Sequence, residues 1–434
     1  MSTKIDMRCL GAFFWGLCLL SCTVQAKEQS TFAAEPHRAL LAELLTRHPG
    51  VLAAMGQLKS AQHDAEGAKW QFLPTASVGI EKNPQSANGL TDTRTTFARL
   101  QQPLWTGGRL TAQLDKARAQ EALANLTLSE QRLGLATRWL QLWSEVQAAE
   151  LKSQAFTESE AQHLKYVRQV QNRAQEGHAP RSDVQLSLSR LAAVQAELEQ
   201  AKAQRQQAIS RLAQMYGGPM PSQTIRWTAV FQPPRRTDES NRSHEQWTVM
   251  ALDNHPSLQK SIVTVNVLRA DADIAKSRIY PEVYLRGELI NRDISRTTQQ
   301  LYVGLTSNFG AGLSSMASVA SAQARLQAQE QEIEVKRRDI SDQIHADLQT
   351  IESQGLRLTY LLQAQESAEQ FMQASERQFD AGRRTWQELM NTAREKAQVH
   401  VQIADTQSTH WLAQQRLALL ATGVEAYLQN NSNP

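Results

Sequence analysis

The chain has little cysteine, few aromatic residues and no long apolar run beyond its N-terminus. Its three cysteines, Cys9, Cys18 and Cys22, all lie within the first 22 of 434 residues. A chain cleaved after Ala26 would therefore have no thiol for a disulfide framework, a metal site or a nucleophile. No later run approaches the roughly 18 apolar residues that a membrane-spanning helix needs. The formal net charge of +3 gives no global basic field of the kind that binds nucleic acid.

What the sequence does contain favours long helices. Aromatic residues make up 6% of the chain, and the longest stretches are rich in Ala, Gln, Leu, Glu and Arg. This composition is typical of long packed helices rather than of several ordinary globular domains. Residues 109–176 contain no proline, so we expect one continuous helix there, about 100 Å long.

The first 26 residues are typical of a secretory signal peptide. Lys4 and Arg8 precede an apolar stretch from Cys9 to Cys22, and Val24-Gln25-Ala26 is suited to cleavage. Leu19-Leu20-Ser21-Cys22 also resembles a lipoprotein cleavage site, with Cys22 as the acylated residue. The anchoring of the mature chain does not depend on which alternative holds.

The sequence after the signal peptide is internally duplicated. His48-Pro49 and His255-Pro256 lie 207 residues apart, and Gly177 and Gly382 lie 205 apart. A consistent offset over nearly 200 residues indicates a repeat. Because both histidines recur with it, we expect them to have a structural role in a helix turn. The predicted organisation is a first repeat (27–217), an inter-repeat connection (218–244), a second repeat (245–422) and a C-terminal tail (423–434).

Each repeat predicts a helix, two strands, a long helix and a last helix. In the first repeat these are residues 35–72, 75–82, 95–102, 109–176 and 182–216. In the second they are residues 245–279, 282–290, 299–307, 314–380 and 385–421. Ser182 is suited to cap the last helix of the first repeat.

A glycine-containing corner joins the second strand to the long helix in each repeat. Pro103 should not sit within a central strand, and Gly107-Gly108 allows a sharp turn before the helix begins. The second corner carries Gly310 and Gly312. Those two glycines do not complete a dinucleotide-binding fingerprint, because no third glycine follows.

The predicted strands have one apolar and one polar face. In residues 282–290, Val283, Leu285 and Leu289 alternate with Tyr284, Arg286 and Glu288. Such strands fit a membrane barrel with a wet interior, or equally a half-exposed soluble sheet. The signal peptide, the lack of a spanning helix and the long helices favour the barrel. Four strands cannot close one, whereas three chains would supply twelve strands and room for a water-filled lumen.

In combination, these features resemble the TolC family of outer membrane factors. The resemblance rests on the duplicated unit, the two His-Pro pairs, residues 102–109 (Gln-Pro-Leu-Trp-Thr-Gly-Gly-Arg) and the paired segments 177–184 and 382–389. It implies a homotrimer, mostly α-helical, whose twelve-stranded outer-membrane β-barrel continues as a periplasmic helical tunnel. It also implies a passive exit duct, not an enzyme, that needs no cofactor and works with a periplasmic adaptor and an inner-membrane transporter.

The resemblance also assigns roles to the two turns that join the long and last helices. It implies adaptor docking at these tips, through Gly177, Ala179, Ser182, Asp183, Gly382, Thr385 and Glu388. A possible gate at the second tip consists of Asp380, Arg383, Arg384 and Glu388. Threefold symmetry would turn each charged residue into a ring of three, able to hold the entrance closed or to select cations. The alternative is ordinary solvated charge at helix ends.

The residues of the second tip suggest a cargo class. The run from Gly382 to Glu395 is similar to the branch that serves type I secretion of large adhesins (LapE/AggA-like proteins). This predicts an exit duct for a large protein, with an ABC-type transporter in the inner membrane. The alternatives are the outer membrane component of a drug or metal efflux pump, and a soluble periplasmic coiled-coil scaffold.

Other conspicuous side chains have simpler interpretations. No nucleophile–base arrangement indicates an enzyme, and His400 and His410 lack the spacing of metal ligands. Trp139 and Trp143, four residues apart, are expected to pack between helices. Trp105 and Tyr302 are candidates for interfacial aromatic belts.

Overall fold

The computed structural model describes residues 36–83, 93–219, 243–292, 295–307, 311–312 and 314–429. The predicted signal peptide, nearly all of the inter-repeat connection and Gly310 lie outside the described residues.

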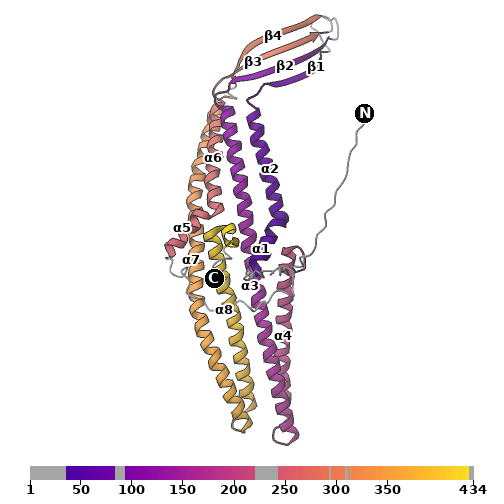
Figure 1. Ribbon diagram of the computed structural model, residues 1–434, viewed down its shortest axis with the longest axis vertical. Coiled ribbons are helices and arrows are strands. Elements are labelled where there is room, and N and C mark those ends of the chain that lie inside the picture. Colours follow the sequence, from indigo (N-terminus) through magenta and orange to yellow (C-terminus); the bar gives the residue numbers. More distant parts are fainter. Residues whose placement is uncertain are drawn as a thin grey trace, which may run out of the picture. The chain divides into compact units, whose positions relative to one another are not determined.

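The same six elements occur twice along the chain (Figure 1). The first set is α1 (Pro36–Arg47), α2 (Pro49–Trp70), β1 (Thr75–Asn83), β2 (Thr93–Trp105), α3 (Arg109–Gln175) and α4 (Arg181–Tyr216). The second set is α5 (His244–Asn254), α6 (Pro256–Ser277), β3 (Glu282–Arg292), β4 (Ser295–Thr306), α7 (Ser314–Asp380) and α8 (Trp386–Gln429). The expected mostly helical, internally duplicated fold is confirmed, and each repeat contributes the two strands predicted for it.

The first predicted helix of each repeat is in fact two helices, broken at the His-Pro pair. A proline disfavours helical backbone at the residue before it, and His48 has φ −65° and ψ 129°. The His48 Nδ1 accepts a hydrogen bond from the Gly50 backbone N–H (3.1 Å), and His255 Nδ1 accepts one from Ser257 (3.3 Å). Both histidines therefore cap the helix that follows, which confirms their expected structural role.

The last helices differ from the prediction at their ends. Pro180, not Ser182, occupies the N-cap of α4 and makes no side-chain cap, so the prediction for Ser182 was wrong. Arg181 already has helical backbone, which places Ser182 inside the first turn. At the other end, the helix that begins α8 breaks at Gly423 (φ 79°, ψ 165°), close to the predicted end at residue 421, and a further helical segment within α8 continues to Gln429.

The helices pack side by side around an apolar interior. α3 contacts α2, α4, α6 and α8, and α7 packs along α6 and α8. Trp139 and Trp143 are almost fully buried in the largest core cluster, as expected, and the Trp139 indole N–H donates to the His37 carbonyl (3.0 Å). Within the described residues, none of the helices is both long and apolar enough to span a membrane.

The four strands form one antiparallel sheet in the order β1-β2-β3-β4. Pro103 lies inside β2, contrary to the prediction, and the register with β3 is irregular between Pro103 and Trp105. The last β1 partner of β2 is Gln101. At Pro103, β2 has no β1 neighbour and forms an edge of the sheet on that side. The N–H that proline lacks therefore costs no hydrogen bond to β1.

Candidate functional site

The sheet leaves its apolar face exposed. Seven of its large apolar side chains are more than two-fifths exposed: Val78, Ile80, Leu100, Leu289, Leu301, Val303 and Leu305. The strand register places them on one face, because Val78 is opposite Ala98, Ala98 is opposite Leu289, and Leu100 is opposite Gly287. An exposed apolar patch of this kind marks a surface that contacts a membrane or another protein.

The opposite face carries a polar network that joins three strands. Arg99 donates through Nε and Nη2 to Glu288 Oε1 (3.0 and 2.5 Å). Arg286 donates through Nε and Nη2 to Gln101 Oε1 (3.0 and 2.6 Å) and through Nη1 to the Tyr302 hydroxyl (3.0 Å). That hydroxyl in turn donates to Glu288 Oε2 (3.3 Å). Tyr302 therefore belongs to this polar face, and its expected place in an aromatic belt was wrong.

Exposed aromatic side chains surround the junction between the sheet and the helices. Trp70 ends α2, Phe72 and the aliphatic Leu73 lie between α2 and β1, and Trp105 ends β2. Trp105 packs edge-on against Tyr280, which precedes β3 (ring centroids 6.2 Å apart). We call these five residues the junction collar.

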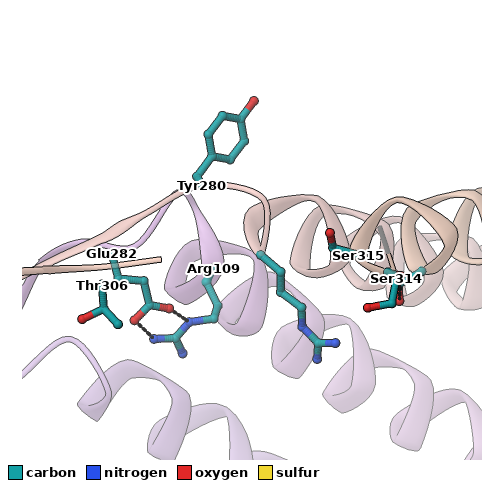
Figure 2. A pocket seen from close by; sticks show the side chains of 8 residues that line it. Arg109, Tyr280, Glu282, Thr306, Ser314 and Ser315 are labelled. Carbon is teal, nitrogen blue, oxygen red and sulfur yellow. Dashed lines mark hydrogen bonds and ion pairs between the residues drawn. The ribbon is translucent and has the colours of Figure 1, made fainter. Parts of the chain in front are cut away.

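An ion pair holds the first corner beneath the sheet. Arg109, the first residue of α3, donates through Nε and Nη2 to both carboxylate oxygens of Glu282 (2.7 and 3.2 Å). Figure 2 shows this pair in a hollow that is also lined by the hydroxyl residues Thr306, Ser314 and Ser315, with Tyr280 pointing out of it. The bidentate contact ties the start of the long helix to the start of β3.

The predicted corner glycines have left-handed backbone where the structure describes them. Gly107, Gly108 and Gly312 have φ values of +60°, +89° and +61°. A Cβ at Gly107 would also lie 2.7 Å from the Cβ of Tyr280, so the turn has no room for a side chain. Gly310 falls outside the described residues.

The first tip is a tight turn between α3 and α4. Gly177 has φ +78°, and the His178 N–H donates back to the Arg173 carbonyl (2.7 Å), closing the end of α3. Gly177 and Ser182 are exposed, whereas Ala179 and Asp183 are partly buried. Asp183 lies in the first turn of α4, where a negative charge complements the helix dipole.

The second tip repeats this turn with different side chains. Gly382 has φ +70°, and the Arg383 N–H donates to the Gln378 carbonyl (2.9 Å). Thr385 Oγ1 accepts from the Glu388 N–H (3.3 Å), so it caps α8. Gly382, Thr385 and Glu388 are all exposed.

The structure brings together only part of the proposed gate. Arg384 Nε donates to Glu388 Oε2 (3.0 Å), and its guanidinium lies over the Phe371 ring (4.7 Å). Asp380 and Arg383 are exposed at the turn. Within one chain, Glu388 is therefore partly neutralised by Arg384.

Sequence reasoning missed the residues that hold the two tips together. Arg173 of α3 donates to the Phe379 carbonyl of α7 (2.7 Å) and stacks on its ring (3.9 Å). Two helical turns before Arg173 in α3, the Tyr166 hydroxyl donates to Glu376 Oε1 of α7 (2.6 Å). Burial first, and then the hydrogen bond to Glu376, raise the pKa of Tyr166. No sequence spacing indicates these pairs, because they join helices about 200 residues apart.

A second missed cluster joins three helices around Lys396. This buried residue of α8 donates to Glu158 of α3 (2.7 Å) and contacts Glu369 of α7 (2.5 Å). Burial alone would lower the pKa of Lys396, but the hydrogen bonds to both carboxylates raise it. Over the described part of the chain, no group of three or more His, Cys, Asp or Glu side chains is placed to hold a metal ion.

Comparison with known proteins agrees with this architecture. A model of the outer membrane efflux protein family matches residues 40–218. No curated protein matches the sequence. The outer membrane protein VceC of Vibrio cholerae is 17% identical, and the match covers 89% of this chain and 96% of VceC with a TM-score of 0.76. The CmeC outer membrane channel of Campylobacter jejuni is 12% identical, with 92% and 89% covered and a TM-score of 0.76.

A third solved structure extends the likeness. CusC, whose crystal structures concern folding and transmembrane channel formation, is 13% identical over 89% of this chain and 92% of its own, with a TM-score of 0.76. The chain thus has the fold of these channels over most of its length. The sequence match falls on the first repeat, and the solved structures extend the likeness in fold to both repeats.

Proposed function

We propose that the protein is the outer-membrane exit duct of a tripartite export system and carries out no chemistry itself. The observation that carries the proposal is the two-faced sheet. One face exposes apolar residues such as Val78 and Leu301, and the other holds the Arg99–Glu288 and Arg286–Gln101 contacts. This arrangement suits a wall with lipid on one side and water on the other.

The working unit in this proposal is a homotrimer. β1 and β4 are the outer strands of the sheet, so each leaves one edge without a partner among the residues that the structure describes. In lipid an open edge is costly because its backbone groups cannot bond to water. Pairing β4 of one chain with β1 of the next closes a twelve-stranded barrel when three chains take part. An eight-stranded dimer would be filled by its own side chains.

The junction collar supports a fixed depth in the membrane. Trp70, Trp105 and Tyr280 are each at least 45% exposed at the place where strands give way to helices. Tryptophan and tyrosine favour the membrane–water interface, because their rings are apolar and carry one polar group. The strands would then lie in the outer membrane, and the helices would continue into the periplasm.

The two tips are then the periplasmic end of the duct. We assign adaptor docking to Gly177, Ala179, Ser182, Asp183, Gly382, Thr385 and Glu388. All of these residues except the partly buried Ala179 and Asp183 are exposed, and the tight glycine turns present backbone and small side chains to a partner. Asp380, Arg383, Arg384 and Glu388 remain the proposed gate.

For the cargo, we propose type I secretion of a large protein such as an adhesin, through an ABC-type transporter in the inner membrane. The support is the second-tip sequence from Gly382 to Glu395 and its resemblance to the LapE/AggA-like branch. The competing candidate is a drug or metal efflux pump, which the efflux family match over residues 40–218 favours.

A clean deletion of the gene separates the two cargo classes. We would score the deletion strain for large surface-displayed or released proteins, and for sensitivity to dyes, detergents and drugs. Loss of one large surface protein with unchanged sensitivity supports secretion. Hypersensitivity with an intact surface assigns the duct to efflux instead. Complementation with the wild-type gene is the control for both readings.

A further inference from the structure

The polar face of the sheet presents two arginines and hides the carboxylate between them. The Glu288 side chain is 8% exposed, whereas that of Arg99 is 33% exposed. Both Glu288 oxygens are occupied, one by Arg99 and the other by Tyr302. The hydrogen bonds of Arg286 go to Gln101 and Tyr302, and neither of these carries a negative charge. One positive charge per chain therefore remains at this level of the sheet, on Arg286.

The Arg286 guanidinium is held in place rather than free to move. Three of its nitrogens donate hydrogen bonds, two to Gln101 and one to Tyr302. Its plane lies over the Tyr284 ring, 4.7 Å from the centroid. Tyr284 in turn lies across Gly304, where there is no room for a side chain. The charge is thus fixed on the surface by its neighbours in β2 and β4.

We propose that Arg286 is a specificity-determining residue that makes the wall of the duct attract anions. This inference rests on the proposed trimeric channel, in which the polar face lines the lumen and three Arg286 side chains form a ring. A ring of guanidinium groups favours anions and the anionic parts of a cargo over cations.

Other charges on this face do not cancel the ring. Glu282 is already paired with Arg109. Glu81 is exposed four residues beyond Ser77, the β1 residue opposite Arg99. That separation is about 13 Å along the strand, which exceeds the Debye length of about 8 Å at physiological salt.

The test is ion selectivity of the purified full chain in planar bilayers. The reversal potential would be measured across a KCl gradient centred near about 150 mM, where the Debye length of about 8 Å screens Glu81 from the ring. Arg286→Gln should lower the chloride-to-potassium permeability ratio about threefold. Arg286→Lys should keep the wild-type ratio, since it keeps the charge.

Arg94→Gln is the matched control. Arg94 is exposed on β2, and its replacement by Gln removes the same charge as Arg286→Gln does. The alternation of side chains along the strand places Arg94 on the apolar face with Leu100. Its ratio should equal that of the wild type. Glu288→Gln provides a second, independent variant and should raise the preference for chloride, because it removes the carboxylate that offsets the arginines.

The outcomes separate this inference from the proposed function. Conductance steps with an unchanged ratio in both Arg286→Gln and Glu288→Gln would overturn the role of Arg286 and leave the channel intact. An equal shift in Arg94→Gln would also overturn it, because overall charge would then explain the effect. A wild-type protein that gives no conductance step would count against the channel itself.

Discussion

One of the buried histidines, His37, couples the stability of the helices to pH. His37 lies between the Trp143 and Trp411 rings, and its Nε2 is 3.1 Å from the Tyr427 hydroxyl. Burial, and secondarily the charge of Arg38, lower the pKa of His37 from 6.5 to about 3. The folded protein therefore keeps this ring neutral at pH values where the unfolded chain protonates it.

The contribution of His37 to the free energy of unfolding is fully present above pH 6.5. It declines as the pH falls towards 3, by about 1.4 kcal/mol per pH unit at most. We expect the melting temperature to fall across this range, and His37→Gln to reduce the slope. His63→Gln, at an exposed histidine, is the control. A variant slope equal to that of the wild type would contradict this role for His37.

Gly382 offers a residue-scale test of adaptor docking. Its φ of +70° strains any other side chain, yet no atom lies within 4 Å of where a Cβ would sit. Asn tolerates this backbone, so Gly382→Asn should keep both trimer yield and adaptor cross-linking. Gly382→Trp should keep the trimer and abolish cross-linking, because the ring projects from an exposed turn. Normal cross-linking of Gly382→Trp would remove this residue from the docking surface.

The residue scale also shows what the sequence could reveal. Glycines at strand and helix ends were predictable, because only glycine readily adopts the positive φ found at Gly107 and Gly382. The partners of Lys396 and Arg173 were not, because they depend on which faces of distant helices meet. Even the alternation that identified the polar face could not show that Arg99 binds Glu288.

At the scale of elements, Lys396 ties α8 to α3 and α7. Glu158 and Glu369 are about half exposed, while the Lys396 side chain is 6% exposed. Removing both carboxylates would leave a buried ammonium without an anionic partner, whereas removing the lysine leaves carboxylates that water can reach.

We therefore predict an asymmetric effect on stability. The double variant Glu158→Gln/Glu369→Gln should lower the free energy of unfolding by about 1–3 kcal/mol, a range reduced for the exposure of the acids. Lys396→Met should lower the free energy of unfolding by less than the double variant does. Denaturant unfolding followed by circular dichroism would measure both. A larger loss of unfolding free energy for Lys396→Met than for the double variant would contradict this prediction. It would show that attraction within the ion pairs, and not the cost of a buried unpaired ammonium, dominates at this cluster.

Element boundaries were predictable where local chemistry dominates. α7 runs from Ser314 to Asp380 as predicted, because its limits are set by turn residues. The His-Pro break was read as part of a helix, although a proline in an apolar helical pattern also permits a new helix start at that residue. The continuation of α8 to Gln429 depends on packing, since Tyr427 is buried against the rest of the core.

At the scale of the whole molecule, the gate makes a prediction about conductance. If Asp380 and Glu388 help to close the entrance, changing both to Ala should raise single-channel conductance in planar bilayers. Glu388 is paired with Arg384, so Glu388→Ala also frees that guanidinium. Arg384→Gln therefore controls for loss of the pair alone. Conductance equal to the wild type in the double variant would exclude these carboxylates from the gate.

Closure of three copies of this sheet into one barrel can be tested by cysteine cross-linking between neighbouring chains. The sequence after Ala26 contains no cysteine, so an introduced pair reports without background. Val78→Cys in β1 would be combined in turn with Cys at Leu301, Val303 or Leu305 of β4, all exposed on the same face. Val78→Cys alone is the control.

Oxidation in isolated outer membranes, followed by denaturing electrophoresis, gives the result. We expect at least one combination to form covalent dimers and trimers and nothing larger, because β4 of the third chain meets β1 of the first. Monomers alone in every combination, or a ladder that continues past the trimer, would contradict a closed twelve-stranded barrel.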